Sequence, residues 1–242
     1  MKTKLKVVYI LPSRFDDEGH VMRFWRGILP SNTLACLRGL TCAVADAGEL
    51  GPDVAVSVDI YDDTIQRIPV AKIARMNRAA DTQVVVGLVG VQTNQFPRAS
   101  ELALQFRDLG IPVMIGGFHV SGIMAMFGEP DADMRRLMDR GVAMVRGEVD
   151  GPGVLAGILR DALEGRLDTL YEIEESPDLY NAPVPMPDAA YRKRFAMHMS
   201  TIDSSRGCPF NCSFCTVINV QGRKMRHRSP ECVLRAVEDG FK

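Results

Sequence analysis

Three cysteines near the end of the sequence are the side chains best suited to unusual chemistry. Cys208, Cys212 and Cys215 lie within eight residues, and Gly207 precedes them. A glycine permits a sharp turn, and three thiolates in one compact loop can bind three irons of a cubane cluster. The loop offers no fourth thiolate, so one iron stays open to chelate a small molecule. The spacing therefore predicts an iron–sulfur cluster with one open iron.

A zinc site built from the same cysteines and His227 is the structural alternative. Zinc sites usually pair Cys-x2-Cys or histidine ligands at longer separations, and ferredoxins use Cys-x2-Cys-x2-Cys with a fourth cysteine. The spacing here matches neither pattern. Cys232 could supply a fourth ligand, but its place on a predicted helix favours a packing role. We therefore favour the cluster over zinc.

The segment around the cysteines resembles the signature of the radical S-adenosylmethionine (SAM) superfamily. It reads SSRGCPFNCSFCT, with the aromatic Phe214 before the last cysteine. The resemblance implies that Cys208, Cys212 and Cys215 bind a 4Fe-4S cluster and that Phe214 lies beside the SAM adenine. It also implies reductive cleavage of SAM to a 5′-deoxyadenosyl radical, with a reductant such as flavodoxin or ferredoxin as partner.

The residues before the cysteine motif predict an α/β domain that would hold a ligand. Strands alternate with helices, and five βα units indicate a flavodoxin-like, doubly wound parallel sheet. The predicted strands are 4–11, 54–60, 83–91, 112–115 and 142–145, and the helices are 33–47, 70–80, 97–110, 131–140 and 154–163. Residues 54–60 alternate apolar with other side chains, as an edge strand does, so we expect the strand order 2-1-3-4-5.

Three regions follow from this pattern. Residues 1–168 form the flavodoxin-like domain, and 169–195, rich in proline, form a linker or a strap along the surface. Residues 196–242 begin a radical SAM domain, with a strand at 196–202 and a helix that starts at Ser229 and Pro230. This is the first βα unit of a truncated partial barrel, so we expect an incomplete enzyme, inactive alone, whose residues 196–242 behave poorly by themselves.

A doubly wound domain before such a motif resembles the cobalamin-dependent radical SAM subfamily. Ligands of these sheets bind at the carboxyl ends of the strands. The resemblance at those ends implies cobalamin contacts from Asp62, Gly90, Thr93, Gly116, Gly117, His119, Gly147 and Glu148. Modules that ligate cobalt carry Asp-x-His-x-x-Gly in the first loop, and His20 is not in that context. We therefore expect no histidine ligand, and His119 as a wall or hydrogen-bonding residue. The alternative is a domain that binds no cofactor.

Several other residues admit two interpretations. The basic run 223–228 is either a solvated loop or a contact for an anionic group such as a carboxylate or phosphate. Phe24 and Trp25 either cap a ligand or pack against the linker. Cys36 and Cys42 are too few and unsuitably spaced for a second cluster, so we expect them in the core.

Composition narrows the class of protein. The net charge of −1 gives no bulk attraction to nucleic acid, and no apolar run is long enough to span a membrane. No secretory signal is evident, so we expect a cytoplasmic enzyme with a small-molecule substrate. The resemblance to the cobalamin-dependent radical SAM subfamily favours methyl transfer to an unactivated carbon or phosphorus. The alternatives are a cyclase or rearrangement enzyme, a radical SAM enzyme without cobalamin, and a non-catalytic metal- or cofactor-binding module.

Overall fold

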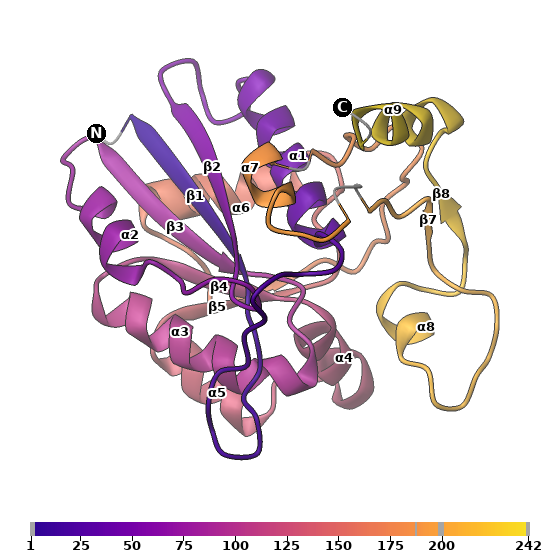
Figure 1. Cartoon of the computed structure of the whole chain (residues 1–242), viewed down its shortest axis with the longest axis horizontal. Coiled ribbons are helices and arrows are strands. Elements are labelled where there is room, and N and C mark those ends of the chain that lie inside the picture. Colours follow the sequence, from indigo (N-terminus) through magenta and orange to yellow (C-terminus); the bar gives the residue numbers. More distant parts are fainter. Residues whose placement is uncertain (1–2, 187, 198–200, 241–242) are drawn as a thin grey trace.

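A parallel β-sheet forms the middle layer of the protein (Figure 1). The computed structural model describes residues 3–186, 188–197 and 201–240. The six strands of this sheet run in the order β2-β1-β3-β4-β5-β6, so β2 is an edge and the predicted order 2-1-3-4-5 is confirmed. Their bounds are β1 Lys4–Leu11, β2 Ala55–Asp62, β3 Thr82–Leu88, β4 Val113–Gly116, β5 Val142–Arg146 and β6 Leu170–Glu172.

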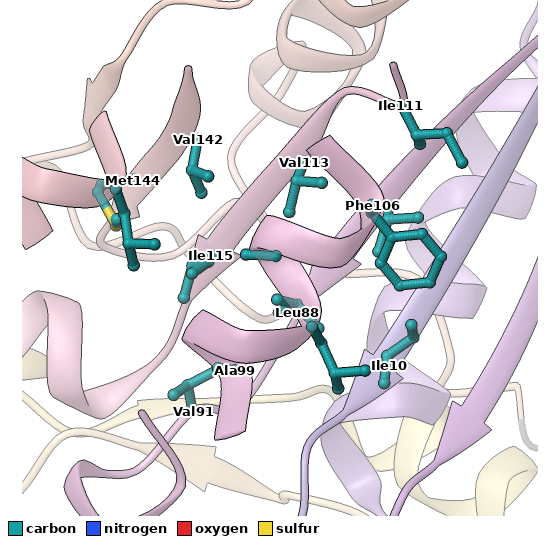
Figure 2. Close-up of a cluster of buried hydrophobic side chains, with 14 of the residues drawn as sticks. Ile10, Leu88, Val91, Ala99, Phe106, Ile111, Val113, Ile115, Val142 and Met144 are labelled. Carbon is teal, nitrogen blue, oxygen red and sulfur yellow. The ribbon is translucent and has the colours of Figure 1, made fainter. Parts of the chain in front are cut away.

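Helices cover both faces of the sheet, which makes the fold doubly wound. One face carries α2 (Val70–Asn77), α3 (Phe96–Asp108), α4 (Phe118–Phe127) and α5 (Ala132–Asp139), and the other carries α1 (Asn32–Asp46), α6 (Val154–Glu164) and α7 (Ala189–Arg192). Alternate strand residues supply the two cores because side chains along a strand point to opposite faces. Thus Val8 and Ile10 pack into the first core and Val7 and Tyr9 into the second. Figure 2 shows part of the first core, where Phe106 of α3 packs near Ile10 and Leu88.

Helix α4 and strand β6 were not predicted, and neither were the short helix α7 and the 3-10 helix Thr93–Gln95. Helix α4 is apolar around most of its surface, so it lacks the one-sided stripe that marks a helix in sequence. Strand β6 has three residues, pairs in parallel with β5, and lies inside the segment predicted as a linker. Both were missed because neither carries enough residues of one period to be recognised.

The proline-rich segment after β6 is a strap that crosses α1 and does not hang free. Met186 donates its backbone N–H to the carbonyl of Ala35 at 2.9 Å. A Cβ added at Gly39 would lie 2.4 Å from the carbonyl oxygen of Val184, so the strap rests directly on the helix backbone there. The strap therefore carries the chain from the sheet edge back over the α1 face.

The C-terminal part extends to one side of the sheet domain (Figure 1). It holds β7 (Ser205–Arg206), α8 (Val217–Val220), β8 (Arg226–His227) and α9 (Pro230–Gly240). Ser229 caps α9, since its Oγ accepts the N–H of Cys232 at 3.1 Å, as predicted. The strand predicted at 196–202 differs: 198–200 lie outside the described residues, 201–202 are irregular, and the strand starts only at Ser205. Among the described residues, no helix has the length and apolar character to cross a membrane.

Candidate cofactor and cluster site

A cavity of about 310 Å³ opens at the carboxyl end of the sheet, on the face covered by α1 and α6. Tyr9, Leu88 and Met114 give it an apolar floor, and the ends of β3, β4 and β5 form one wall. The C-terminal part closes it from outside with Asp203, Ser205, Arg206, Val220 and Gln221. Its volume falls within the roughly 300 to 1,000 Å³ of small-molecule sites. The cavity therefore lies between the sheet and the segment that carries the cysteines.

Five of the predicted strand-end residues line this cavity, namely Gly90, Gly116, Gly117, Gly147 and Glu148. The protein's own backbone already requires three of these glycines, because Gly90 (φ 64°), Gly117 and Gly147 have a positive φ. A Cβ at Gly117 (φ 145°) would lie 2.2 Å from the Val91 nitrogen, and one at Gly147 (φ 95°) would lie 2.1 Å from the Ile173 oxygen. At Gly116 an added Cβ would make only ordinary contacts, at 3.4 Å or more. Gly116 is thus the wall glycine whose lack of a side chain is not explained by the fold itself.

The three cysteines share one loop that is closed at its base. β7 and β8 pair antiparallel, with Ser205 opposite His227, and the Cys208 N–H donates to the Gly222 carbonyl at 3.1 Å. Gly207 (φ 87°) sits so close to Lys224 that an added Cβ would lie 2.3 Å from its carbonyl oxygen. The chemistry-bearing loop, residues 208–222, is therefore fixed where it enters and leaves.

Inside this loop the thiols are accessible. Cys208, Cys212 and Cys215 are all free, and Cys212 is exposed. Phe214 is 87% exposed beside them. Among the described residues, no three His, Cys, Asp or Glu side chains are grouped to hold a single metal ion. A cubane cluster has a different requirement, since it takes each thiolate on a separate iron. The loop carries three free cysteines for this, of which Cys212 is exposed and the other two are half-buried.

Six charged side chains, two of them buried and four half-buried, join the cysteine segment to the sheet. We call them the neck cluster: Glu148, Asp150, Asp203, Arg206, Arg226 and Arg228. Arg206 donates to Glu148 and Asp150 at 2.8 Å each and to Asp203 at 2.6 Å. Burial alone would lower the pKa of Arg206, but the hydrogen bonds with Asp150 and the three nearby carboxylates raise it. The cluster matches three arginines with three carboxylates.

The neck cluster changes the interpretation of the basic run. The side chains of Arg226 and Arg228 are only 8% and 1% exposed, so they are not part of a solvated face. Their partners are carboxylates of this chain, Glu148 and Asp203, and not an external anion. Arg223 and Lys224 are exposed as predicted for a loop. The sequence does contain the signal, since acidic residues follow β5 and arginines flank the cysteines, but nothing local pairs them.

Comparisons with known proteins agree with this arrangement. No family model matches the chain. It is 30% identical over 165 residues to bacteriochlorophyllide d C-8(2)-methyltransferase of Chlorobaculum tepidum. The aligned region covers 64% of this chain and 33% of the relative. It is 24% identical over 167 residues to hopanoid C-2 methylase of Rhodopseudomonas palustris. That aligned region covers 67% of this chain and 29% of the relative.

A solved structure shares the fold. It is the radical SAM methyltransferase TsrM of Kitasatospora setae with tryptophan substrate and a SAM analogue bound; it aligns with a TM-score of 0.55 and 18% identity over 98% of this chain and 44% of its own. These similarities agree with the predicted resemblance to the N-terminal portion of the cobalamin-dependent radical SAM superfamily. The chain spans about a third of the length of the curated relatives it matches.

Three residues predicted from the superfamily resemblance do not line the cavity. Asp62 is buried and accepts hydrogen bonds from the backbone and hydroxyl of Thr64, at 2.9 and 2.5 Å, and from the Tyr191 hydroxyl at 2.9 Å. Burial raises the pKa of Asp62, while these hydrogen bonds act in the opposite direction. Its carboxylate thus serves the strap, which carries Tyr191.

His119 and Thr93 lie together outside the cavity. The His119 ring stacks on Phe96 with centroids 3.9 Å apart, and its Nδ1 is 3.4 Å from the Thr93 hydroxyl. The other ring nitrogen, Nε2, is buried without a hydrogen-bond partner and lies 3.8 Å from the Asp131 carboxylate. Burial lowers the pKa of His119 despite the nearby carboxylates. His119 is therefore a packing residue of the α3 face.

The remaining candidate residues are the two aromatic residues of the first long loop and the three cysteines outside the cysteine loop. Trp25 is 95% exposed and Phe24 is 58% exposed, and neither lines the cavity. Phe195 of the strap lies against Gly27. Cys36 is buried on the cavity wall beside Asp203 and Arg228, and burial raises its pKa to about 12. Cys42 is half-buried. Cys232 is buried in α9, with its Sγ 3.8 Å from the Ala182 carbonyl, which agrees with a packing role.

Proposed function

We propose that this chain is the cofactor-binding part of a radical SAM methyltransferase that uses cobalamin. One observation carries the proposal: the cavity at the carboxyl edge of the sheet is closed by the same segment that bears the three cysteines. A cofactor in the cavity and a cluster on the loop would therefore be neighbours. The named relatives are a methyltransferase and a methylase, which favours methyl transfer over cyclisation or rearrangement.

The thiols of Cys208, Cys212 and Cys215 would hold a 4Fe-4S cluster with one open iron. When bound, the cluster supplies an electron for the reductive cleavage of SAM. The exposed Phe214 on the same loop offers an aromatic face to the adenine of SAM. A reducing compartment, the cytoplasm, would keep these thiols free, and a small one-electron donor such as flavodoxin or ferredoxin would serve as reductant.

The cavity would take cobalamin along its glycine wall. When bound, cobalamin supplies the methyl group for transfer. Gly90, Gly116, Gly117 and Gly147 allow backbone groups to approach a large ligand without side chains between them. Gly116 is the clearest case, because the fold itself does not require a glycine there. Glu148 also lines the wall, but its carboxylate is already bound by two arginines. The substrate would be a small molecule.

The decisive experiment is anaerobic reconstitution of the full chain with iron, sulfide and hydroxocobalamin, followed by desalting. We expect the absorbance of a cubane cluster together with retained corrinoid absorbance. Cys212→Ala should abolish the cluster spectrum and leave corrinoid retention intact. Leu37→Trp, which places a large side chain in the cavity, should abolish corrinoid retention and leave the cluster intact.

The exposed Leu109 provides the matched control, since Leu109→Trp adds the same bulk away from the cavity. It should retain corrinoid like the unchanged chain. Loss of corrinoid from the unchanged chain on desalting contradicts the cobalamin half of the proposal. Uptake of zinc without any iron contradicts the cluster half and favours a non-catalytic metal-binding module.

A further inference from the structure

We propose that Glu148 is a positioning residue that closes the neck of the cysteine loop. Its carboxylate binds two arginines that face each other across the β7–β8 ladder, and the loop can close only when the carboxylate lies between them. The sheet domain thereby sets the geometry of the thiols. The consequence for a cluster rests on the proposed function, but the closure itself does not.

The ladder at the base of the loop carries an unfavourable pair. Arg206 and Arg226 are direct partners in the antiparallel register. Side chains directly opposite in such a pair lie on the same face, and like charges there are destabilising. The ladder has two residues in each strand, so it has little backbone pairing to offset this repulsion. A two-stranded ribbon of any length is marginal in water.

Glu148 supplies the missing negative charge at that point. Its Oε2 accepts from Arg206 at 2.8 Å and from Arg226 at 3.1 Å, and its Oε1 accepts from Arg226 at 2.5 Å. The three side chains are only 11%, 12% and 8% exposed, so solvent screens the repulsion between the arginines little. Asp150 adds a bidentate contact to Arg206 at 2.8 and 3.1 Å.

The carboxylate is presented by a rigid turn of the sheet domain. Gly147, its neighbour, donates its N–H to the Ser121 hydroxyl at 3.1 Å and packs against the Ile173 carbonyl. Glu148 also lines the cavity. The same residue therefore fixes one wall of the cavity and the point where the cysteine loop leaves the ladder, at Arg206, two residues before Cys208.

Hydrogen exchange on the full chain without metal tests the closure. The amides to follow are Cys208, which donates to Gly222, and Arg228, which donates to Ser204; Val89, bonded to Ile10 in the sheet, is the reference. Glu148→Gln should speed exchange at Cys208 and Arg228 by about tenfold or more, since removing one partner of a buried ion pair leaves the others uncompensated. Val89 should stay protected.

A second variant separates this role from general damage. In Glu148→Gln the repulsion between Arg206 and Arg226 remains, so adding Arg226→Met should restore part of the protection at Cys208. The matched control is Glu172→Gln, which removes the more exposed partner of Arg146 and should leave both neck amides unchanged. Unchanged exchange at Cys208 in Glu148→Gln overturns the proposal. Glu148→Gln could also lose protection at Val89, which would indicate general damage. In that case the proposal is overturned if adding Arg226→Met gives no more protection at Cys208 than Glu148→Gln alone.

A cluster-based readout follows the same variants after reconstitution with iron and sulfide. Glu148→Gln should lose iron to a chelator faster than the unchanged chain, and the double variant should recover part of that loss. If the unchanged chain takes up no cluster, the proposed function fails while the exchange result still decides the closure.

Discussion

Gly117 illustrates how a single residue decides the shape of the cavity wall. It has a φ of 145°, and a Cβ there would lie 2.2 Å from the Val91 nitrogen. Because both the backbone conformation and the space exclude a side chain, Gly117→Ala should destabilise the protein by about 3 kcal/mol or more. Chemical denaturation followed by circular dichroism measures this loss.

Gly122, five residues further along α4, is the matched control for that substitution. An added Cβ there meets nothing within 4 Å, and the residue is helical. Gly122→Ala should therefore be neutral or stabilise by up to about 1 kcal/mol through helix propensity. Equal losses at both positions would contradict a specific role for the Gly117 conformation.

His119 gives the molecule a pH dependence. Burial holds its pKa below the ordinary value of 6.5, so the folded state favours the neutral ring. The unfolded chain then binds more protons, and the free energy of unfolding should fall as the pH drops below 6.5. The contribution is complete above that pH. His119→Gln should flatten this part of the stability curve, measured by denaturation between about pH 7 and 5.

The exposed His20 provides the control for this titration. Its side chain is 75% exposed, so His20→Gln removes a histidine without disturbing the core. A slope that survives in His119→Gln would assign the pH dependence to other groups.

At the residue scale, the sequence identified the groups whose role is local. The cysteine spacing and the glycines at strand ends are recognisable because their neighbours in sequence are also their neighbours in space. The carboxylates that pair with the basic run were missed, since Glu148 and Arg226 are 78 residues apart. Asp62 was expected at a ligand because it ends a strand, but its partner Tyr191 comes 129 residues later.

At the element scale, recognition depended on one-sided patterns. Strand β1 was predicted over the residues it occupies, and α6 begins at the predicted Val154 and ends before Gly165. α4 and β6 were missed because an apolar helix and a three-residue strand give no clear period. Packing against the sheet and pairing with β5 determine these elements.

The strap is an element whose attachment can be tested. The Tyr191 hydroxyl donates to Asp62 at 2.9 Å and accepts the Ser31 N–H at 3.0 Å. Tyr191→Phe should cost about 2 kcal/mol, because a buried carboxylate loses a donor. It should also raise the pKa of Asp62 further, since this hydrogen bond lowers it. Thermal unfolding and carboxyl titration by NMR measure the two effects. Tyr180→Phe, at an exposed tyrosine, should change neither.

At the scale of the whole molecule, the site is assembled from the sheet domain and the C-terminal part of the chain. The members of both hydrophobic core clusters come from residues up to Phe195. The C-terminal part contributes the cysteines and part of the cavity wall, and it is attached through the neck cluster and the strap. The sheet domain can therefore form without the cysteine loop, whereas the loop depends on the sheet domain.

Separate expression of the two parts tests this dependence. Residues 1–195 keep both cores, so they should unfold cooperatively. Residues 196–242 leave behind Glu148 and Asp150, the partners of Arg206, and lose the Ser229 contact with Tyr180 of the strap. With two arginines facing each other and no carboxylate from the sheet domain between them, the β7–β8 ladder should not form. An NMR spectrum of residues 196–242 should show little dispersion and no protected amide at Cys208. A dispersed spectrum with that amide protected would mean that the loop closes by itself. The closure would then not depend on the sheet domain.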